Sequence, residues 1–497
     1  MGMSCRGSRT LGARLGGLLA IVMCLGLAGV ACAQNAPPVV PAAPVVVEKA
    51  DSGATAWMLI SSALVMVMMP GLALFYAGMV RRKNVLGTMM HSMAALGIIG
   101  VEWVVIGYAM AFGTSQHGLI GWDWSKLFLQ GITPETMIKP GSATVPELVF
   151  VMFQGMFAII TPALIAGAFA ERVKFSAYAL FTLLWGIIIY NPLAHWVWGG
   201  GWLGAGTTGL HIGAIDFAGG TVVHISAGVS ALICAIYIGK RLGYPQHVLQ
   251  PNSLVLTLLG AGLLWFGWFG FNGGSAVAGD PNIPFANAAV AAFTNTQIAA
   301  AAGAMAWLIA EWLKHGRATS LGFASGLVAG LVAVTPASGY VHPMGALAIG
   351  VAAGLVCYGA VLLKGRLGYD DSLDAFGVHG VGGFLGAILT GVFAVKIFGG
   401  TAGAIQGNWA QVGKQAIAAC TAAAYAGIGT IVLLVIIDKT IGFRMKQKYE
   451  IEGMDAALHG EQGWMLEPGG VPTIGLPGDA SVDISVASKA RETAGTH

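Results

Sequence analysis

Apolar residues in this chain gather into long continuous runs separated by short polar stretches. A run of about 20 apolar residues can cross the hydrocarbon core of a membrane as a helix. Runs of this kind can be placed eleven times along the sequence, so the pattern predicts an all-α polytopic membrane protein with eleven spans. We expect the spans near 55–80, 88–112, 147–170, 175–198, 218–239, 252–272, 286–313, 320–336, 340–363, 376–396 and 415–438.

The first 33 residues show a different pattern, which is typical of a secretory signal peptide. Three arginines precede the apolar run 18–30, and the small residues Ala31-Cys32-Ala33 follow it. We expect cleavage before Gln34, which leaves 34–54 as a short periplasmic segment. A retained first membrane helix is the alternative, and the shortness of the run disfavours it. The transmembrane domain is then expected over 55–440 and a cytoplasmic regulatory tail over 441–497, disordered toward its end.

The placement of lysine and arginine predicts the orientation of the spans, because cytoplasmic loops of membrane proteins are enriched in these residues. With the mature amino terminus outside, the cytoplasmic loops and the start of the tail hold fifteen of the 25 basic residues, and the outer segments hold five. The other five lie in the signal peptide and the far tail. The chain is therefore expected in the inner (cell) membrane, with its amino terminus outside and its carboxyl terminus in the cytoplasm.

The composition agrees with a membrane protein and argues against nucleic acid, metals and cofactors as partners. Charged residues are 9% of the chain and hydrophobic residues 56%, too apolar to solvate a globular surface. The net charge of +3 gives no basis for nucleic-acid binding. Cys234, Cys357 and Cys420 stand alone in apolar runs, so we expect no thiolate metal site, no cofactor and no enzyme activity. The 75 glycines predict close helix packing.

Two aspartate–histidine pairs stand out inside the apolar runs. Asp216 opens the fifth span and His224 follows about 12 Å further along a helix, while Asp374 opens the tenth span about 7.5 Å before His379. The fifth span enters from outside and the tenth from the cytoplasm, so the two histidines approach the membrane midplane from opposite faces. This predicts an inverted repeat of spans one to five and six to ten, with one extra helix.

Two neutral histidines can share a proton and form a polar stripe in an apolar pore. Separate buried histidines, each bonded to a backbone carbonyl, are an alternative, and axial haem ligation is another. Asp216 and Asp374 each fit a helix cap as well as a functional role. Glu102, in the middle of the second span, is interpreted here as a structural hydrogen-bonding group in preference to a transport residue.

Aromatic residues gather toward the outer ends of three spans. Phe153 and Phe157 lie one helical turn apart in the third span. Trp198 ends the fourth span, and the sixth exits through Trp268, Phe271 and Ser275. Ring faces around a mouth attract a small cation, although tryptophan at this level also fits an interfacial belt. An apolar path below the mouth then refuses a bare ion, so a protonated weak base that sheds its proton fits, and ammonium is such a base.

These residues belong to strings that resemble the Amt/Mep/Rh ammonium transporter family, most closely its bacterial Amt branch. The strings are FQGMFAIITPALIAGAFAER (153–172), AHWVWGGG (194–201), DFAGGTVVHISAG (216–228), WFGFNGGS (268–275), GLVAVTPASGY (330–340) and DAFGVHGVGG (374–383). The resemblance implies an eleven-helix bundle with an inverted repeat, assembled as a homotrimer with one pore per subunit.

The resemblance also implies a role for each candidate residue. Trp198, Phe157 and Ser275 look like the outer recruitment site, which Asp216 supports without touching the ion. Phe157 and Phe271 look like the gate, with Phe153 and Trp268 beside it. His224 and His379 look like the twin-histidine pore, and Asp374 is a supporting residue.

The tail segment 451–461 resembles the part of these transporters that meets a PII-type regulatory protein, and the implied activity is uptake of ammonium nitrogen. An ammonium sensor that signals through its tail is the alternative, but the 59 residues after Asp438 are too few for an output domain. A haem-bearing redox enzyme with His224 and His379 as ligands is a third reading.

Overall fold

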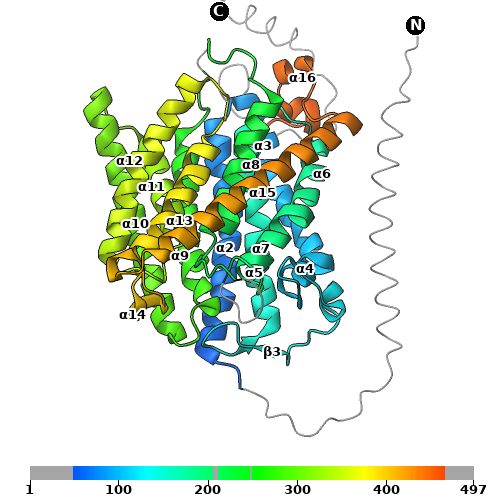
Figure 1. The fold of residues 1–497 in the computed structure, drawn as a ribbon. Helices are drawn as coiled ribbons and strands as arrows, with labels where there is room; N and C mark the ends of the chain where they lie inside the picture. Colours follow the sequence, from blue (N-terminus) through cyan, green and yellow to red (C-terminus); the bar gives the residue numbers. More distant parts are fainter. Residues whose placement is uncertain (1–48, 205–210, 247–248, 465–497) are drawn as a thin grey trace, which may run out of the picture.

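The computed structural model describes residues 49–204, 211–246 and 249–464, which form one helical bundle (Figure 1). The predicted signal peptide and the far end of the tail lie outside the described residues. Two ends of the bundle are named here by their contents. The hairpin end carries two short β-hairpins, and the tail end carries the last helices, α16 (Gln447–Glu452) and a π-helical turn, Asp455–His459.

Nine membrane-length apolar helical segments occur within the described residues. They contain α2 (Ser52–Met79), α3 (Val85–Glu102) with α4 (Tyr108–Phe112), α5 (Glu147–Ile165), α6 (Phe175–Trp185) with α7 (Asn191–Val197), α8 (Ser226–Ile238), α9 (Leu254–Gly274), α12 (Pro343–Leu367), α13 (Val381–Phe393) and α15 (Ala410–Thr440). Two further helices, α10 (Phe285–His315) and α11 (Ser320–Val334), lie where the seventh and eighth spans are expected. The multi-pass architecture is thus present, and the count of eleven spans stays a prediction.

Four of these segments contain a π-helical turn, in which the backbone accommodates one extra residue per turn. The turns join α3 to α4, join α6 to α7, open α8 and open α13, and they cover Trp103–Gly107, Gly186–Tyr190, Gly220–Ile225 and Phe376–Gly380. Short 3-10 turns occur at Arg82–Asn84, Trp124–Leu129, Ala166–Phe169, Ser275–Ala278 and Ala404–Gln406, and α14 covers Lys396–Gly399.

Small residues bring the helices close together, as the glycine content predicts. A Cβ atom added at Gly330 of α11 would lie 2.1 Å from the carbonyl oxygen of Ala299 in α10, and one at Gly326 would lie 2.6 Å from that of Gly303. Two membrane helices gain little from the hydrophobic effect against each other, so backbone approach and van der Waals contact hold them. The glycine face of α11 therefore docks directly onto α10.

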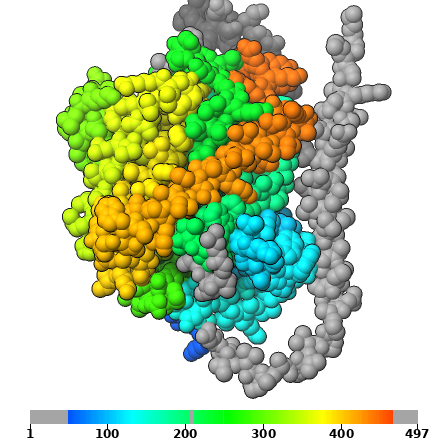
Figure 2. Space-filling view, viewed as in Figure 1, coloured from blue at the N-terminus to red at the C-terminus, as the bar shows by residue number. Residues whose placement is uncertain are grey.

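At the hairpin end, antiparallel pairs join β1 (Ser115–Gln116) to β2 (Ile120–Gly121) and β3 (Met137–Ile138) to β4 (Val145–Pro146). The last long helix, α15, runs obliquely across one face of the bundle (Figure 1). Its orange side chains form a continuous diagonal ridge in the space-filling view (Figure 2). α15 packs against α8, α13 and α6, so it ties together spans from both halves of the chain.

Ion pairs connect the loops at the tail end. The Arg241 guanidinium lies 2.8 Å from Asp370 Oδ1 and 3.5 Å from Glu171 Oε2, while Arg81 Nε and Arg172 Nη1 contact Glu171 and Asp370 at 3.0 and 2.9 Å. Burial alone would raise the pKa of the Glu171 carboxyl, but Arg241 and Arg81 hold that pKa below its usual value. Burial would likewise raise the pKa of the Asp370 carboxyl, but Arg241 and Arg172 hold it below its usual value.

The carboxyl-terminal segment is bound to this end of the bundle by its own contacts. Asp455 Oδ1 accepts a hydrogen bond of 2.8 Å from the backbone N–H of Gly87, in the first turn of α3. Asn84 Oδ1 accepts one of 2.8 Å from the N–H of Met454. A carboxylate at this position satisfies a free donor and meets the positive end of the helix dipole. The tail therefore caps the second membrane-spanning segment.

Candidate functional site

Two phenylalanine rings are in close contact, tilted against each other, in the interior of the bundle. The ring centroids of Phe157, from α5, and Phe271, from α9, are 4.1 Å apart with an interplanar angle of 31°. Phe153, one turn before Phe157 on α5, packs edge-on against Phe157 at 5.0 Å. Both rings of the pair are about 1% exposed. The structure thus brings together the three phenylalanines that the sequence analysis placed at a gate.

Trp198 lies on the hairpin side of this pair. Its ring meets Phe157 edge-on at 6.0 Å, and its indole N–H donates to the backbone carbonyl of Asp216 at 2.8 Å. The Asp216 carboxylate accepts four backbone hydrogen bonds of 2.7–3.1 Å from residues 219–222, the start of the fifth segment. Gly219 adopts a left-handed φ of +111°, a region open to glycine. Asp216 therefore fixes both the segment start and the indole.

The two histidines meet below the phenylalanine pair. The Nδ1 atoms of His224 and His379 lie 3.3 Å apart, and their rings are nearly parallel, at 18°. The Trp268 ring lies 5.5 Å from that of His224 and nearly parallel to it, and its indole N–H donates to Thr335 Oγ1 at 2.9 Å. This geometry does not fit the alternative of two separate histidines, each bonded to a backbone carbonyl. One imidazole must donate and the other must accept.

Close backbone contact places the histidines opposite each other. A Cβ atom on Gly228 of α8 would lie 2.1 Å from the backbone nitrogen of Gly380, the residue after His379. One on Gly383 would lie 2.9 Å from Cβ of His224. The fifth and tenth segments therefore cross at glycines, and larger residues would separate the two π-helical turns that carry the imidazoles.

Two small cavities lie on either side of the histidine pair. The first has a volume of about 10 Å³ and is lined by Phe271, Trp268, His224, His379 and aliphatic side chains, with no charged residue. The second, of about 30 Å³, is lined by His379, Asp374, Tyr76 and neighbouring apolar residues, toward the tail end. The first is at the lower limit for a single water-sized molecule, and the second has room for at least one. The histidines thus separate two cavities in one file.

Ser275 and Asp374 occupy less direct positions. The Ser275 hydroxyl is buried and donates to the Phe271 carbonyl at 2.9 Å, which leaves its lone pairs free to accept. Phe153 packs against Gly274, the preceding residue. Asp374 lies in the left-handed region, with φ of 59°, and forms an ion pair of 2.5 Å with Lys364.

The helix-capping role considered for Asp374 belongs instead to Asp371, which the sequence analysis missed. Its carboxylate accepts hydrogen bonds from the N–H groups of Ala375 and Phe376, at 3.1 and 2.8 Å. Burial raises the pKa of Asp371 to about 6, against the opposing charge of Lys364. The available signal was spacing, because Asp371 precedes His379 by eight residues, as Asp216 precedes His224.

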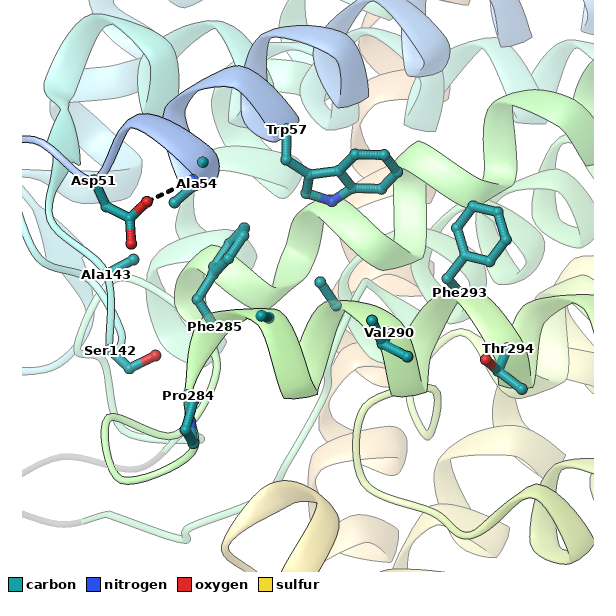
Figure 3. A pocket seen from close by; sticks show the side chains of 13 residues that line it. Asp51, Ala54, Trp57, Ser142, Ala143, Pro284, Phe285, Val290, Phe293 and Thr294 are labelled. Atoms are coloured by element: carbon teal, nitrogen blue, oxygen red, sulfur yellow. Dashed lines mark hydrogen bonds between the residues drawn. The ribbon is translucent and has the colours of Figure 1, made fainter.

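A larger cavity of about 720 Å³ lies apart from this file (Figure 3). It separates the amino-terminal ends of α2 and α10 at the hairpin end, and Trp57, Phe285 and Phe293 give it an aromatic wall. None of the ten predicted site residues lines it. Within the described part of the chain, no group of three or more histidine, cysteine, aspartate or glutamate residues is arranged to hold a metal ion.

The multi-pass bundle and its buried file of rings define the class of this protein, a helical membrane transporter. A family model described as "Ammonium Transporter Family" matches residues 56–464. The chain belongs to the ammonium transporter family.

Relatives and solved structures agree with this assignment. An "Ammonium transporter" from Mycobacterium tuberculosis (strain ATCC 25618 / H37Rv) is 47% identical over 442 residues, which cover 83% of this chain and 90% of the relative. One from Bacillus subtilis (strain 168) is 44% identical over 415 residues, covering 83% and 98%. The crystal structure of Saccharomyces cerevisiae Mep2 matches with a TM-score of 0.72 and 34% identity, covering 80% of this chain and 88% of that one.

Proposed function

We propose that this ammonium transporter recruits ammonium at an outer aromatic site, deprotonates it, and conducts ammonia through the twin-histidine pore into the cytoplasm. Trp198, Phe157 and Ser275 form the recruitment site, supported by Asp216. Phe157 and Phe271 form the gate, flanked by Phe153 and Trp268, and His224 and His379 line the pore beneath it. Asp374 supports the inner mouth.

The observation that carries this proposal is the ring pair Phe157–Phe271 above a histidine pair, with no charged side chain in the cavity that Phe271 and the histidines line. Moving an isolated cation from water into a low-dielectric interior costs tens of kcal/mol of transfer free energy in an idealised estimate. A cation–π contact returns only about 2 kcal/mol. The rings can therefore attract ammonium at the mouth, but they cannot carry it through the gate as an ion.

Ammonia avoids this penalty because it carries no charge and can both donate and accept hydrogen bonds. The shared-proton geometry of His224 and His379 offers one donor and one acceptor site along the file. Neutral imidazoles add polarity without an electrostatic trap for passing cations. Loss of one proton at the gate therefore selects ammonium over potassium, which has no proton to lose.

The wider arrangement follows from the same proposal. The spans number eleven, as five plus five in an inverted repeat with one extra, and the amino terminus faces outside and the tail the cytoplasm. Supporting this, His224 and His379 each lie in a π-helical turn that opens a segment, with an aspartate eight residues before. The protein assembles as a homotrimer in the inner membrane, and a PII-type protein contacts the tail.

Uptake of isotope-labelled ammonium by proteoliposomes tests the function. Liposomes with the purified protein should take up label faster than protein-free liposomes, with a rate that saturates at high ammonium. Uptake equal to the protein-free control would refute the proposal. Ammonium binding without uptake would instead favour the sensor alternative.

A further inference from the structure

A second polar centre is marked by the π-helical turns. Within the described membrane-spanning segments these turns occur at four places, and two of them carry His224 and His379. The other two, Trp103–Gly107 and Gly186–Tyr190, contact each other beside Glu102. π-helical turns are rare because the extra residue disturbs the regular hydrogen bonding of the helix. Where they do occur, they are often at functional sites. The pair around Glu102 therefore calls for a function of its own.

Glu102 is a buried carboxylate within the second membrane-spanning segment. It is 4% exposed, and its Oε1 accepts a hydrogen bond of 2.7 Å from Asn191 Nδ2. Its Oε2 has no hydrogen-bond partner among the residues that the structure describes. Cβ atoms on Gly107 and Gly186, one from each π-helical turn, would approach Oε2 to 3.0 and 3.8 Å. Two glycines thus leave space around an oxygen that lacks a donor, at a depth where ionisable groups are usually functional.

Three polar atoms of this cluster lack partners. They are Glu102 Oε2, Asn191 Oδ1 and the Tyr190 hydroxyl, all on residues at most 4% exposed. Buried polar atoms in proteins are nearly always paired with protein or with ordered water. Two of the three are acceptors only, so the cluster is short of hydrogen-bond donors. A proton on Glu102 or a water molecule between these atoms supplies what is missing.

Tyr190 links this cluster to the recruitment site. It ends the π-helical turn Gly186–Tyr190, which contacts α5, the helix that carries Phe157, and which continues into α7 and Trp198. The two carboxylates differ in their hydrogen bonds. Asp216 accepts four from backbone N–H groups, whereas Glu102 accepts one. Four fixed donors stabilise the anionic form of Asp216 more than one donor stabilises that of Glu102, so Asp216 is the poorer proton acceptor of the two.

We propose that Glu102 holds the proton that ammonium releases at the gate. In this step an N–H bond of ammonium breaks and ammonia leaves with the electron pair. The Tyr190 hydroxyl accepts that proton, through water, as it passes its own to Glu102, where a carboxyl O–H bond forms. Each transport cycle loads Glu102 once and unloads it once. This inference rests on the proposed function and names the group that function needs.

The surroundings of Glu102 leave few competing groups. In the fourth segment, Tyr190 is the titratable side chain beside Glu102. Toward the hairpin end, Tyr108 of the same segment donates to Glu147 of α5 at 2.7 Å, and Lys126 pairs with that carboxylate. Glu147 is also 4% exposed, but its Oε1 has two partners, the Tyr108 hydroxyl and the Lys126 ammonium group. It therefore serves as a matched control.

The test compares Glu102→Gln, Tyr190→Phe, Glu102→Asp and Glu147→Gln with wild type in proteoliposomes. Glutamine keeps the acceptor for Asn191 and loses the proton-holding group. We expect E102Q and Y190F to lower the maximal ammonium rate at least about tenfold, with half-saturating ammonium within about twofold of wild type, because recruitment is intact. Aspartate should restore part of the rate, and E147Q should resemble wild type. If E102Q kept the wild-type rates and pH profile, the inference would be overturned. The proposed function would still stand, provided that the wild type takes up ammonium.

An infrared difference spectrum gives a readout that does not depend on transport. Adding ammonium to the purified wild type should produce a protonated-carboxyl band that E102Q lacks and E147Q keeps. A band unchanged in E102Q would overturn the inference. If E102Q does not elute as folded protein in size-exclusion chromatography, Y190F carries the test, since its band should be weaker or slower to form, and a wild-type band and rate in Y190F would count against the relay.

Discussion

The Nδ1 atoms of His224 and His379 face each other at 3.3 Å, although the two residues are 155 positions apart in the chain. At this distance only one Nδ1 carries a proton when both rings are neutral, and charging both would set two cations against each other. The pair is therefore polar, and its geometry disfavours protonation of both rings at once.

Removing this polarity should change what the pore conducts. In the double variant His224→Leu and His379→Leu, the file becomes wholly apolar, so we expect ammonium uptake to fall at least about tenfold, by analogy with the loss of one polar element from a site. Labelled uptake and current in proteoliposomes measure this. If uptake, current and exclusion of potassium all remained at wild-type levels, the histidines would be structural only.

Asp216 should be required for the geometry of the mouth. In Asp216→Ala four backbone N–H donors lose their acceptor, and each unsatisfied buried donor costs roughly 1–3 kcal/mol. We expect transport to be lost and the melting temperature to fall. Asp216→Asn, which keeps one acceptor oxygen, should be intermediate in both. A folded alanine variant with wild-type rates would remove the supporting role from Asp216.

The crossing of the fifth and tenth segments should tolerate no side chain. Gly228→Ala places a Cβ atom 2.1 Å from the Gly380 nitrogen, so the segments must separate and the histidine contact must lengthen. We expect overpacking to destabilise the protein by about 1–3 kcal/mol and to lower transport. Gly262→Ala is the control, because nothing lies within 4 Å of its added Cβ. Equal melting temperatures and rates for the two variants would contradict this account of the crossing.

The ion pairs at the tail end should make stability depend on pH. The pKa values of Glu171 and Asp370 are lowered in the folded protein, so their stabilisation is complete above the unfolded values of roughly 4 and is lost as pH falls through the folded ones. Arg241→Met removes a shared cation, and we expect a loss of about 3–5 kcal/mol at neutral pH. The loss should shrink as the pH falls below about 4 and through the lowered pKa values of the folded protein, where the carboxyls become protonated.

Melting temperatures across this pH range check the prediction, with substitution of the exposed Arg317 as the control. A difference between Arg241→Met and wild type that stayed constant with pH would contradict the assigned ion pairs.

The sequence predicted the multi-pass helical architecture, because the apolar runs are long and their physical meaning in a membrane is simple. The contacts among the three phenylalanines could also be anticipated, since Phe153 and Phe157 share a helical face and the motif strings contain Phe271, while their role as a gate stays a prediction. A helix cap was one of two roles considered for Asp374, and the structure gives that role to Asp371, which has the same eight-residue spacing from its histidine as Asp216. Spacing reflects the geometry of the turn, and it was the better guide.

The centre at Glu102 was beyond sequence reasoning for a physical reason. π-helical turns have no strong residue pattern, and the contact between Glu102 and Asn191 joins positions 89 apart. The missing partner of Glu102 Oε2 is a property of the packed bundle. The interpretation of Glu102 as a structural hydrogen-bonding group agrees with its bond to Asn191. The proton-holding role is a proposal that rests on the surroundings of the carboxylate.

The comparison of ammonium with potassium in the same proteoliposomes tests the central claim most directly. Both cations can meet the mouth rings, but only ammonium can leave its charge behind at the Phe157–Phe271 gate. We expect the ammonium response, in current or internal pH, to exceed the potassium response at least about a hundredfold, a difference of roughly 2.7 kcal/mol in barrier height. Equal responses to the two cations would contradict deprotonation at the gate.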